Sequence, residues 1–403
     1  MKDIAFSSLA RVFVVVFQLI NIKLYTNYLD AEELGIYFFL LTASYSANAL
    51  LFIPVDYFQQ SILVKVKSAT GGARAILNFN GRLAALYGGF SLLIVAICAI
   101  VTPHFAYYAL LATLLAFAIY AVQALRSTLN NLEHRSCVTV SFIQEAFIKV
   151  LLFFALVQFF KADLALLVLS WLIALLVSGT YLMFKAKAYQ IFAGSDTYPI
   201  HAKEVYTFSY PFSIGAVCNW LQLQGYRLIL VPMGFAEEVG VFATLSSIGS
   251  AAIGAVSLIY SQQFIPLIYK TAGQYTAKYL KGAMLVIFGV AVACLVLGEF
   301  MVTVLTNPNF VQHWELLMYG VITDSAYLIG GAMVIHLTLL GNTKRLIQYA
   351  WVGLASMTLC FGLLYWTDTV SIGTFGVPLL VSQWLGLLYM YTDYKKLVPK
   401  SIS

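Results

Sequence analysis

The sequence predicts an all-α integral membrane protein, with twelve transmembrane helices in two parallel, pseudo-symmetric six-helix lobes around a central cavity. Three observations lead to this prediction: a strongly apolar composition, apolar runs of span length, and one motif that occurs twice. The chain has 403 residues, of which 61% are hydrophobic and 10% are charged, whereas soluble domains carry about 25% charged residues. The composition excludes a soluble globular fold. The net charge of +6 resides mainly in short loops and gives no sign of nucleic-acid binding.

Apolar runs recur at about 20 residues, enough to cross the roughly 30 Å hydrocarbon layer as helices. The residue-by-residue alternation of a membrane β-barrel is absent. No soluble domain fits between the runs. We expect the spans at residues 4–28, 35–60, 83–102, 105–126, 138–160, 163–184, 207–232, 239–263, 283–305, 314–340, 347–366 and 371–392.

The basic residues predict the topology of these spans. With the N-terminus inside, all Lys and Arg residues fall at the cytoplasmic face except Lys161, in an outer loop, and Lys23, Lys149 and Arg227, within spans. Arg126, at the edge of the fourth span, is counted with the cytoplasmic group. Cytoplasmic loops carry the Lys/Arg excess in membrane proteins. We therefore expect both termini to be cytoplasmic and every span to be a helix.

An internal repeat divides the spans into two sets of six. The motif AEELGIY at residues 31–37 returns as AEEVGVF at residues 236–242, each time between two apolar runs. Each copy follows a run with a lone cation near its end, Lys23 or Arg227. An even number of spans makes the halves parallel, and parallel repeats in transporters enclose a substrate path. We expect lobes at residues 1–190 and 207–403, joined by a cytoplasmic linker at 191–206.

The chain lacks the constellations that catalysis or metal binding require. It has no phosphate-binding GxxxxGK[ST] loop, no Ser-His-Asp arrangement and no closely spaced His or Cys set. We therefore expect no enzymatic activity and no cofactor. Transport, if this is the function, is not driven by ATP hydrolysis on this chain.

Ionisable groups within spans are the informative residues, because a charge at mid-bilayer costs at least about 2.5–3.5 kcal/mol and normally faces a cavity or a partner. Asn219, Gln222 and Tyr226 share one helix face close to Arg227. Such a polar stripe faces water or protein rather than lipid. Arg227 and its repeat counterpart Lys23, preceded by polar residues, either face a cavity or snorkel to the outer headgroups.

Glu145 and Lys149 are four residues apart in the fifth span, so they can pair on one face. The pair is either an internal salt bridge for packing or a proton- or substrate-sensitive element of the path. Asp56 and Asp324 are lone acids in the second and tenth spans. Either is a candidate coupling site or the partner of a cation.

Several motifs resemble those of polysaccharide repeat-unit flippases of the Wzx type. These proteins share a superfamily with MATE antiporters and lipid II flippases. The similarity covers essentially the whole chain. It rests on the twelve spans, the break at residues 30–37, the Tyr226-Arg227 pair with residues 236–240, and the segment LGNTK at 340–344. Where family members usually have an acid before the span-seven arginine, this chain has Tyr226, so the resemblance does not extend to an acid–arginine pair there.

The resemblance implies a cationic cavity that opens to one side at a time and moves an undecaprenyl-pyrophosphate-linked oligosaccharide to the outer leaflet of a bacterial inner membrane. It implies membrane lipids, a polysaccharide polymerase and chain-length machinery as partners, and a monomer. Lys23 and Arg227 would clamp the pyrophosphate, and coupling would use protons or sodium. The candidate substrate contacts are Lys23, Lys149, Asn219, Gln222, Tyr226 and Arg227, and the candidate coupling or gating residues are Asp56, Glu145 and Asp324.

Two other functions compete with this one. A drug antiporter on the same fold would need an anionic cavity for cationic cargo, and the cations within spans argue against it. Lipid II flippases resemble longer chains with two extra spans. A membrane polymerase or ligase would resemble chains with a large outer loop that carries Arg and His, whereas the outer loops expected here are short.

Overall fold

The computed structural model describes residues 2–101, 103–194, 198–340 and 344–397. The regular secondary structure of these residues is helical, with no strand among them. The first half contains α1 (Lys2–Tyr28), α2 (Ala31–Ala47), the π-helical turn η1 (Asn48–Phe52), α3 (Ile53–Thr70), α4 (Arg74–Val101), α5 (Pro103–Asn131), α6 (Arg135–Phe159) and α7 (Leu164–Ala188). The second half contains α8 (Ala202–Leu230), α9 (Ala236–Lys270), α10 (Thr276–Leu305), α11 (Pro308–Val311), the 3₁₀ turn η2 (Trp314–Leu316), α12 (Leu317–Leu339), α13 (Lys344–Trp366) and α14 (Gly376–Leu397).

Eight stretches in the described helices are long and apolar enough to cross a membrane, in α4, α5, α6, α7, α9, α10, α12 and α13. The chain is therefore a multi-pass helical membrane protein. Helices also cover the other four expected spans, as α1, α8, α14 and the consecutive pieces α2, η1 and α3. Because these four are not among the eight, the count of twelve spans stays a prediction.

The chain forms two compact units, Met1–Leu29 with Ile36–Ser213 and Asp30–Gly35 with Ile214–Ser403. The second unit begins inside α8, so the expected linker at residues 191–206 belongs to the first. The first turn of α2 belongs to the second unit although the rest of that helix belongs to the first. Two of the boundaries between the units therefore fall inside helices, in α2 and in α8.

The two copies of the repeat motif pack on each other within the second unit. A Cβ atom added to Gly35 would overlap the backbone carbonyl oxygen of Ala236, and one added to Gly240 would overlap that of Ala31. Two helix backbones approach this closely only where the contact residue is small. This reciprocal contact explains why the first turn of α2 is held against the first turn of α9.

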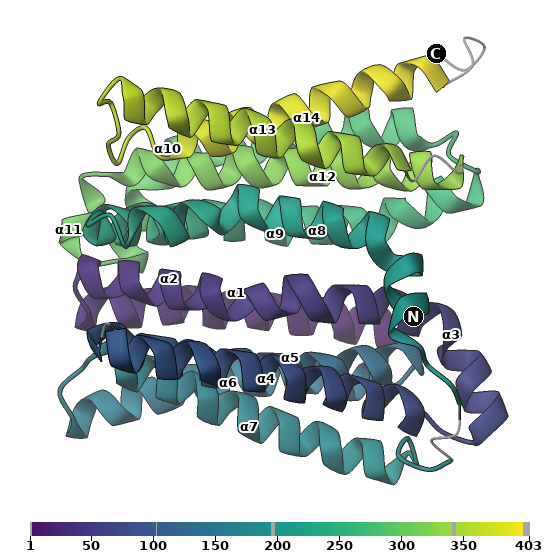
Figure 1. The fold of residues 1–403 in the computed structure, drawn as a ribbon. Coiled ribbons are helices and arrows are strands. Elements are labelled where there is room, and N and C mark those ends of the chain that lie inside the picture. Colours follow the sequence, from purple (N-terminus) through teal and green to yellow (C-terminus); the bar gives the residue numbers. More distant parts are fainter. Residues whose placement is uncertain (1, 102, 195–197, 341–343, 398–403) are drawn as a thin grey trace. The chain divides into compact units, whose positions relative to one another are not determined.

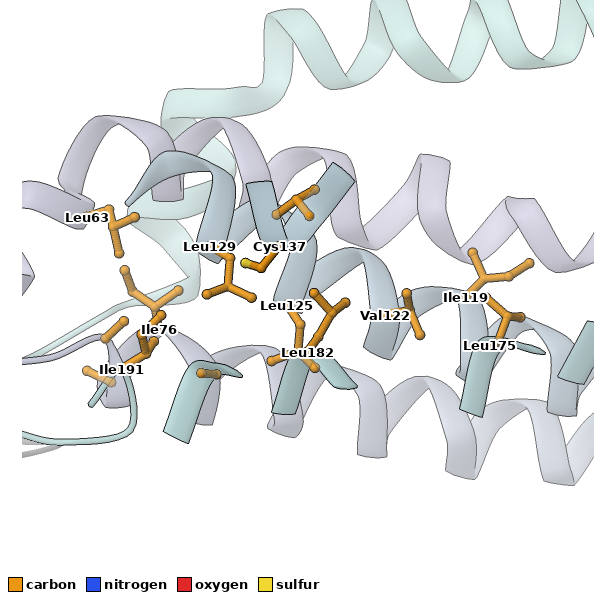
Figure 2. Close-up of a cluster of buried hydrophobic side chains, with 14 of the residues drawn as sticks. Leu63, Ile76, Ile119, Val122, Leu125, Leu129, Cys137, Leu175, Leu182 and Ile191 are labelled. Carbon is orange, nitrogen blue, oxygen red and sulfur yellow. The ribbon is translucent and has the colours of Figure 1, made fainter. Parts of the chain in front are cut away.

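The first unit is organised around α5. This helix packs against α3, α4, α6 and α7, and α6 packs in turn on α1 and α7 (Figure 1). Ile119, Val122, Leu125 and Leu129 follow one face of α5 at helical spacing. They form a buried apolar cluster with Leu182 and other residues of α7, which Figure 2 shows. Burial of this face fixes the rotation of α5 and thus the direction of its polar side chains.

A break in the second expected span separates α2 from α3. The backbone widens to a π-helical turn at Asn48–Phe52, and a proline occupies the first turn of α3. Proline cannot donate the helical hydrogen bond, and π-bulges often mark functional positions. Figure 1 shows that α3 leaves the direction of α2. The break places Asp56 in the first turn of a new helix segment.

The second unit is organised around α12, which packs on α9, α10 and α14, while α13 packs on α14. Near the end of α14, just beyond the last expected span, Asp393 accepts a hydrogen bond from Tyr349 at 2.9 Å and pairs with Arg345 at 2.7 Å. Burial raises the pKa of Asp393, but the hydrogen bonds from Arg345 and Tyr349 outweigh it, so the pKa lies below its ordinary value. The charged carboxylate ties α13 to α14.

The glycine contact gives a stability prediction. Gly35→Ala and Gly240→Ala each force a methyl group into a backbone carbonyl, and such overpacking costs about 1–3 kcal/mol. We expect a lowered melting temperature in detergent for both variants. Gly81→Ala in α4 and Gly289→Ala in α10 are matched controls, because a Cβ at either position meets nothing within 4 Å. Equal melting temperatures for the two pairs would refute the contact.

Candidate functional site

Three charged side chains gather inside the first unit, where α5 and α7 both pack on α6. Arg126 comes from α5, and Glu145 and Lys149 come from α6. Trp171 of α7 and Tyr37 of α2 complete this group, which we call the charged cluster. Because α5, α6 and α7 are all candidate spans, the cluster brings charge into the apolar part of the protein.

Local sequence signals position the aromatic members of the cluster. Asp163 precedes α7, and its Oδ1 accepts a hydrogen bond from the backbone N–H of Leu166 at 2.8 Å. Asp30 precedes α2 and accepts one from the N–H of Glu33, also at 2.8 Å. Aspartate is a preferred residue at the helix N-cap because it satisfies an otherwise free N–H group. These caps define where α7 and α2 begin, and hence the faces on which their aromatic side chains lie.

Arg126 is the most buried charge of the cluster, with 3% of its surface exposed. Its Nη2 lies 2.7 Å from Oε2 of Glu145. Its Nε donates to Oγ of Ser141 at 2.9 Å, and Nη2 donates to the Ser141 backbone carbonyl at 3.1 Å. The guanidinium also stacks 3.9 Å over the ring of Phe142. A planar guanidinium with several fixed partners is held in one orientation.

This geometry bears on two expectations from the sequence. Arg126 is buried in the helix packing, because α5 continues to Asn131, and its place relative to the membrane stays a prediction. Glu145 does not form its ion pair with Lys149, although they are four residues apart on α6. The carboxylate pairs instead with Arg126 of the neighbouring helix, as an ion pair of 2.7 Å.

Lys149 is held by aromatic groups. Its Nζ donates to the Tyr37 hydroxyl at 2.9 Å and lies 4.3 Å from the ring centroid of Trp171. The Trp171 indole N–H donates to Oε1 of Glu145 at 2.9 Å, which fixes that ring. Within the part of the chain that the structure describes, no carboxylate lies within salt-bridge distance of Nζ. The ammonium is stabilised by hydrogen bonding and a cation–π contact.

The charged cluster therefore holds two cations and one carboxylate. An ammonium has three donors, and Tyr37 accepts from only one of them. Lys149 as a whole residue is half-buried. Aromatic rings pack around it, with Tyr25 6.0 Å from Tyr37 and Tyr45 6.4 Å from Trp171 between centroids. Tyr25, Tyr37 and Trp171 are themselves buried, so the cluster places a surplus positive charge among aromatic side chains.

A second polar group lies in the second unit, on the face of α8 that the sequence predicted. The Gln222 side-chain amide donates to the backbone carbonyl of Ala350 in α13 at 2.9 Å. The Gln383 amide of α14 donates to Gln222 at 3.0 Å and to Asn219 at 3.4 Å. The predicted stripe thus faces protein, and these three side chains link α8 to α13 and α14.

The stripe continues to the Tyr226-Arg227 pair. Tyr226 is 1% exposed and meets Phe242 of α9 edge-on, with centroids 5.6 Å apart. Nε of Arg227 donates to the Tyr226 hydroxyl at 3.0 Å. Arg227 is half-buried, so it is reachable from outside the helix packing.

The remaining candidates lie elsewhere. Lys23 is half-buried in α1, and Asp56 is half-buried in α3 after the break. Asp324 is half-buried in α12 and accepts a hydrogen bond from Ser250 of α9. The segment at 340–344, used for the family resemblance, includes residues 341–343, which lie outside the described part of the chain. Among the described residues, no group of His, Cys, Asp and Glu is placed to hold a metal.

Sequence reasoning missed three members of the charged cluster. Tyr37 was visible as the last residue of the repeat motif, but nothing marked its hydroxyl as a partner of Lys149. Trp171 carried a weaker signal, since an indole N–H within a span needs an acceptor. Arg126 was assigned from its position at a span edge. Only the helix packing shows that its side chain is buried and pairs with Glu145.

Comparison with known proteins supports the fold and leaves the sequence family open. No protein-family model matches the chain, and no curated protein matches it significantly. Solved structures do match over nearly the whole length. The lipid II flippase MurJ in an inward closed conformation has a TM-score of 0.73 at 16% identity, covering 97% of this chain and 87% of MurJ. An inward-facing multidrug resistance MATE transporter of the MOP superfamily has a TM-score of 0.64 at 13% identity, covering 97% and 100%.

A third match is a MOP-superfamily transporter from Pyrococcus furiosus whose binding pocket has reversed polarity. Its TM-score is 0.51 at 10% identity, and the match covers 98% of this chain and 93% of that one. At these identities the likeness establishes the fold alone. The protein therefore has the fold of the MOP-superfamily transporters, and its cargo must be argued from its own residues.

The amide network gives a testable prediction with an internal control. Gln222→Ala removes one acceptor and one donor from a buried group, and an unsatisfied buried polar group costs about 1–3 kcal/mol. We expect a clear drop in melting temperature in detergent. Gln224→Ala on the same helix should have little effect, because the described residues show no hydrogen bond from that side chain. A similar loss of stability in both variants would contradict the network.

Proposed function

We propose that the protein is a flippase that moves an undecaprenyl-pyrophosphate-linked oligosaccharide from the cytoplasmic to the outer leaflet of a bacterial inner membrane by alternating access. The observation that carries this proposal is the charged cluster, where Lys149 presents an ammonium among aromatic rings and no carboxylate of the described residues pairs with it. A diphosphate-linked sugar needs both features, a cation for its phosphates and flat apolar surfaces for its sugar rings.

The energetics of the membrane support an anionic cargo. An ionised lysine in a span is costly unless it is paired or serves a ligand. In the charged cluster only one of the two cations has a carboxylate. A cationic drug would be repelled by this surplus charge, whereas a pyrophosphate would compensate for it. The fold is compatible with either, since it occurs in both MATE transporters and the lipid II flippase MurJ.

The other candidate residues receive roles within this proposal. Lys23 and Arg227 contribute further cationic contacts to the pyrophosphate, with Tyr226 orienting Arg227. Asn219 and Gln222 hold α8 in place for these contacts. Asp56, Glu145 and Asp324 are the acids available for coupling to a proton or sodium gradient. The chain would act as a monomer with twelve spans and cytoplasmic termini, and would hand its product to a polysaccharide polymerase and its chain-length machinery.

A second candidate function is drug export. The likeness to MATE transporters and the half-buried acids Asp56 and Asp324 favour it. The two functions differ in the sign of charge that the cargo carries. A membrane polymerase or ligase remains the alternative from another class, and the short loops between the described helices offer no large outer domain for it.

The first functional prediction concerns Lys149. Loss of a hydrogen bond to a charged group costs about 1.5–3 kcal/mol, which is about tenfold or more in affinity. We expect Lys149→Gln to reduce the export of surface polysaccharide about tenfold, and Lys149→Arg to retain it. The assay uses cells that lack their own copy of this gene, with membrane levels matched by immunoblot.

Lys161→Gln is the control for Lys149→Gln, because Lys161 is exposed between α6 and α7. It should export like the wild type. Normal export by Lys149→Gln would remove the main support for an anionic cargo. Increased sensitivity to cationic dyes on loss of the protein, with unchanged polysaccharide, would favour the antiporter.

A second functional prediction tests the two remaining cations. Lys23→Ala and Arg227→Ala should each reduce export, while Lys23→Arg and Arg227→Lys should retain most of it, because either cation forms charge-assisted hydrogen bonds to phosphate. The same export assay applies. If both alanine variants export normally, the two side chains are anchors that reach towards the headgroups, and the charged cluster alone handles the pyrophosphate.

A further inference from the structure

The sequence of α6 alone does not determine which cation of the charged cluster pairs with Glu145. Glu145 and Lys149 are four residues apart, a spacing at which a carboxylate and an ammonium readily pair along a helix. These two residues, both described by the structure, do not pair. The carboxylate is engaged by other groups on both of its oxygens, with Arg126 at Oε2 and the Trp171 indole N–H at Oε1.

We propose that Arg126 is a positioning residue that holds the Glu145 carboxylate away from Lys149, so that the Lys149 ammonium remains available to the phosphate groups of an anionic cargo. This inference rests on the function proposed above. It assigns Arg126, which touches no cargo in this scheme, a role in setting the charge that the cluster presents.

The surroundings of Arg126 suit this role. Two hydrogen bonds to Ser141, at 2.9 and 3.1 Å, and the Phe142 ring beneath the guanidinium hold the group in place. Ser141 lies on α6, one turn before Glu145. The arginine is therefore fixed relative to the same helix that carries both members of the competing pair. A flexible cation could release the carboxylate, whereas this one cannot move without losing several bonds.

Trp171 completes the separation. Its indole N–H occupies the second oxygen of Glu145, and its ring lies beneath the Lys149 ammonium at 4.3 Å. The ring stabilises the cation through its quadrupole and carries no formal charge. It therefore supports Lys149 without neutralising it. A carboxylate in the same place would cancel the charge that an anionic ligand needs.

This arrangement predicts the net charge of the cluster in each variant. With Arg126, Glu145 and Lys149 ionised, the cluster has one surplus positive charge, and it resides at Lys149. In Arg126→Gln the surplus is lost, because Glu145 is left to pair with Lys149. In the double variant Arg126→Gln/Glu145→Gln the surplus returns, since no carboxylate remains. The amide oxygen that Glu145→Gln introduces would still accept the Trp171 N–H.

The experiment measures equilibrium binding of undecaprenyl pyrophosphate to the purified full-length protein in detergent, with inorganic pyrophosphate as a second probe. Undecaprenol, which lacks phosphate, is the ligand control. We expect Arg126→Gln to weaken binding about tenfold, which equals the loss of about 1.4 kcal/mol. The double variant should recover to within about threefold of the wild type, and Glu145→Gln alone should bind at least as tightly as the wild type. Arg126→Lys should bind less tightly than the wild type but more tightly than Arg126→Gln, because a flexible ammonium keeps the charge without the fixed contacts of the guanidinium.

Melting temperatures, measured for all variants, report how much each substitution destabilises the fold. The binding of the two single variants separates the positioning role from a structural one. Removing either partner of a buried ion pair destabilises a protein, so a merely structural pair predicts weaker binding in Arg126→Gln and Glu145→Gln alike. Opposite effects of the two single variants on binding support positioning. Weak binding by Glu145→Gln, or no recovery in the double variant, overturns it. Should Arg126→Gln fail to fold, the comparison of Glu145→Gln with the double variant and the wild type decides.

Lys149→Gln distinguishes failure of this inference from failure of the proposed function. If Lys149→Gln binds undecaprenyl pyrophosphate like the wild type, the phosphate does not bind at Lys149 and the proposed function loses its support. If Lys149→Gln binds weakly but the Arg126 variants do not follow the expected order, the anion site stands and only the role of Arg126 is wrong.

Discussion

The ion pair between Arg126 and Glu145 organises the first unit. It joins α5 to α6, and a hydrogen bond from Trp171 to Glu145 extends it to α7. The Trp171 ring contacts Lys149, which donates to Tyr37 of α2. Charged groups in an apolar environment must be paired or they destabilise the fold. Because the pair satisfies one cation and one anion, a second cation can persist beside it. The chemistry of the candidate site follows from this arrangement.

Close packing of backbones is the corresponding constraint in the second unit. Between apolar helices the hydrophobic effect contributes little in a membrane, so association depends on close contact and polar bonds. Gly35 and Gly240 allow the two repeat motifs to approach backbone to backbone, and the amide network around Gln222 links three further helices. The two copies of the motif form a contact surface, which explains why small residues occupy the same place in both.

Much of the fold was predictable because hydropathy acts locally. Helices occupy every expected span, and the structure describes their ends within a few residues of the predicted limits in α1, α6 and α7. The break at η1 was not predicted, since a single proline near a span end does not reveal a π-helical turn. The site was predicted less well. Asn219 and Gln222 were correctly placed on one face, whereas the partner of Glu145 was not, because that partner comes from another helix.

Residue order alone is enough for the class of protein, the helical ranges and the presence of unusual charges within them, because each depends on the residues of one segment and on the length of a membrane span. The repeat is likewise visible in the residue order. Which charges meet depends on how the helices pack. In the sequence Arg126 lies at the edge of a span, and it becomes the partner of Glu145 only when α5 and α6 pack. The carboxylate of Glu145 is neutralised by its neighbour in space, Arg126, rather than by its neighbour in sequence. Lys149 is therefore surrounded by aromatic rings instead of a carboxylate.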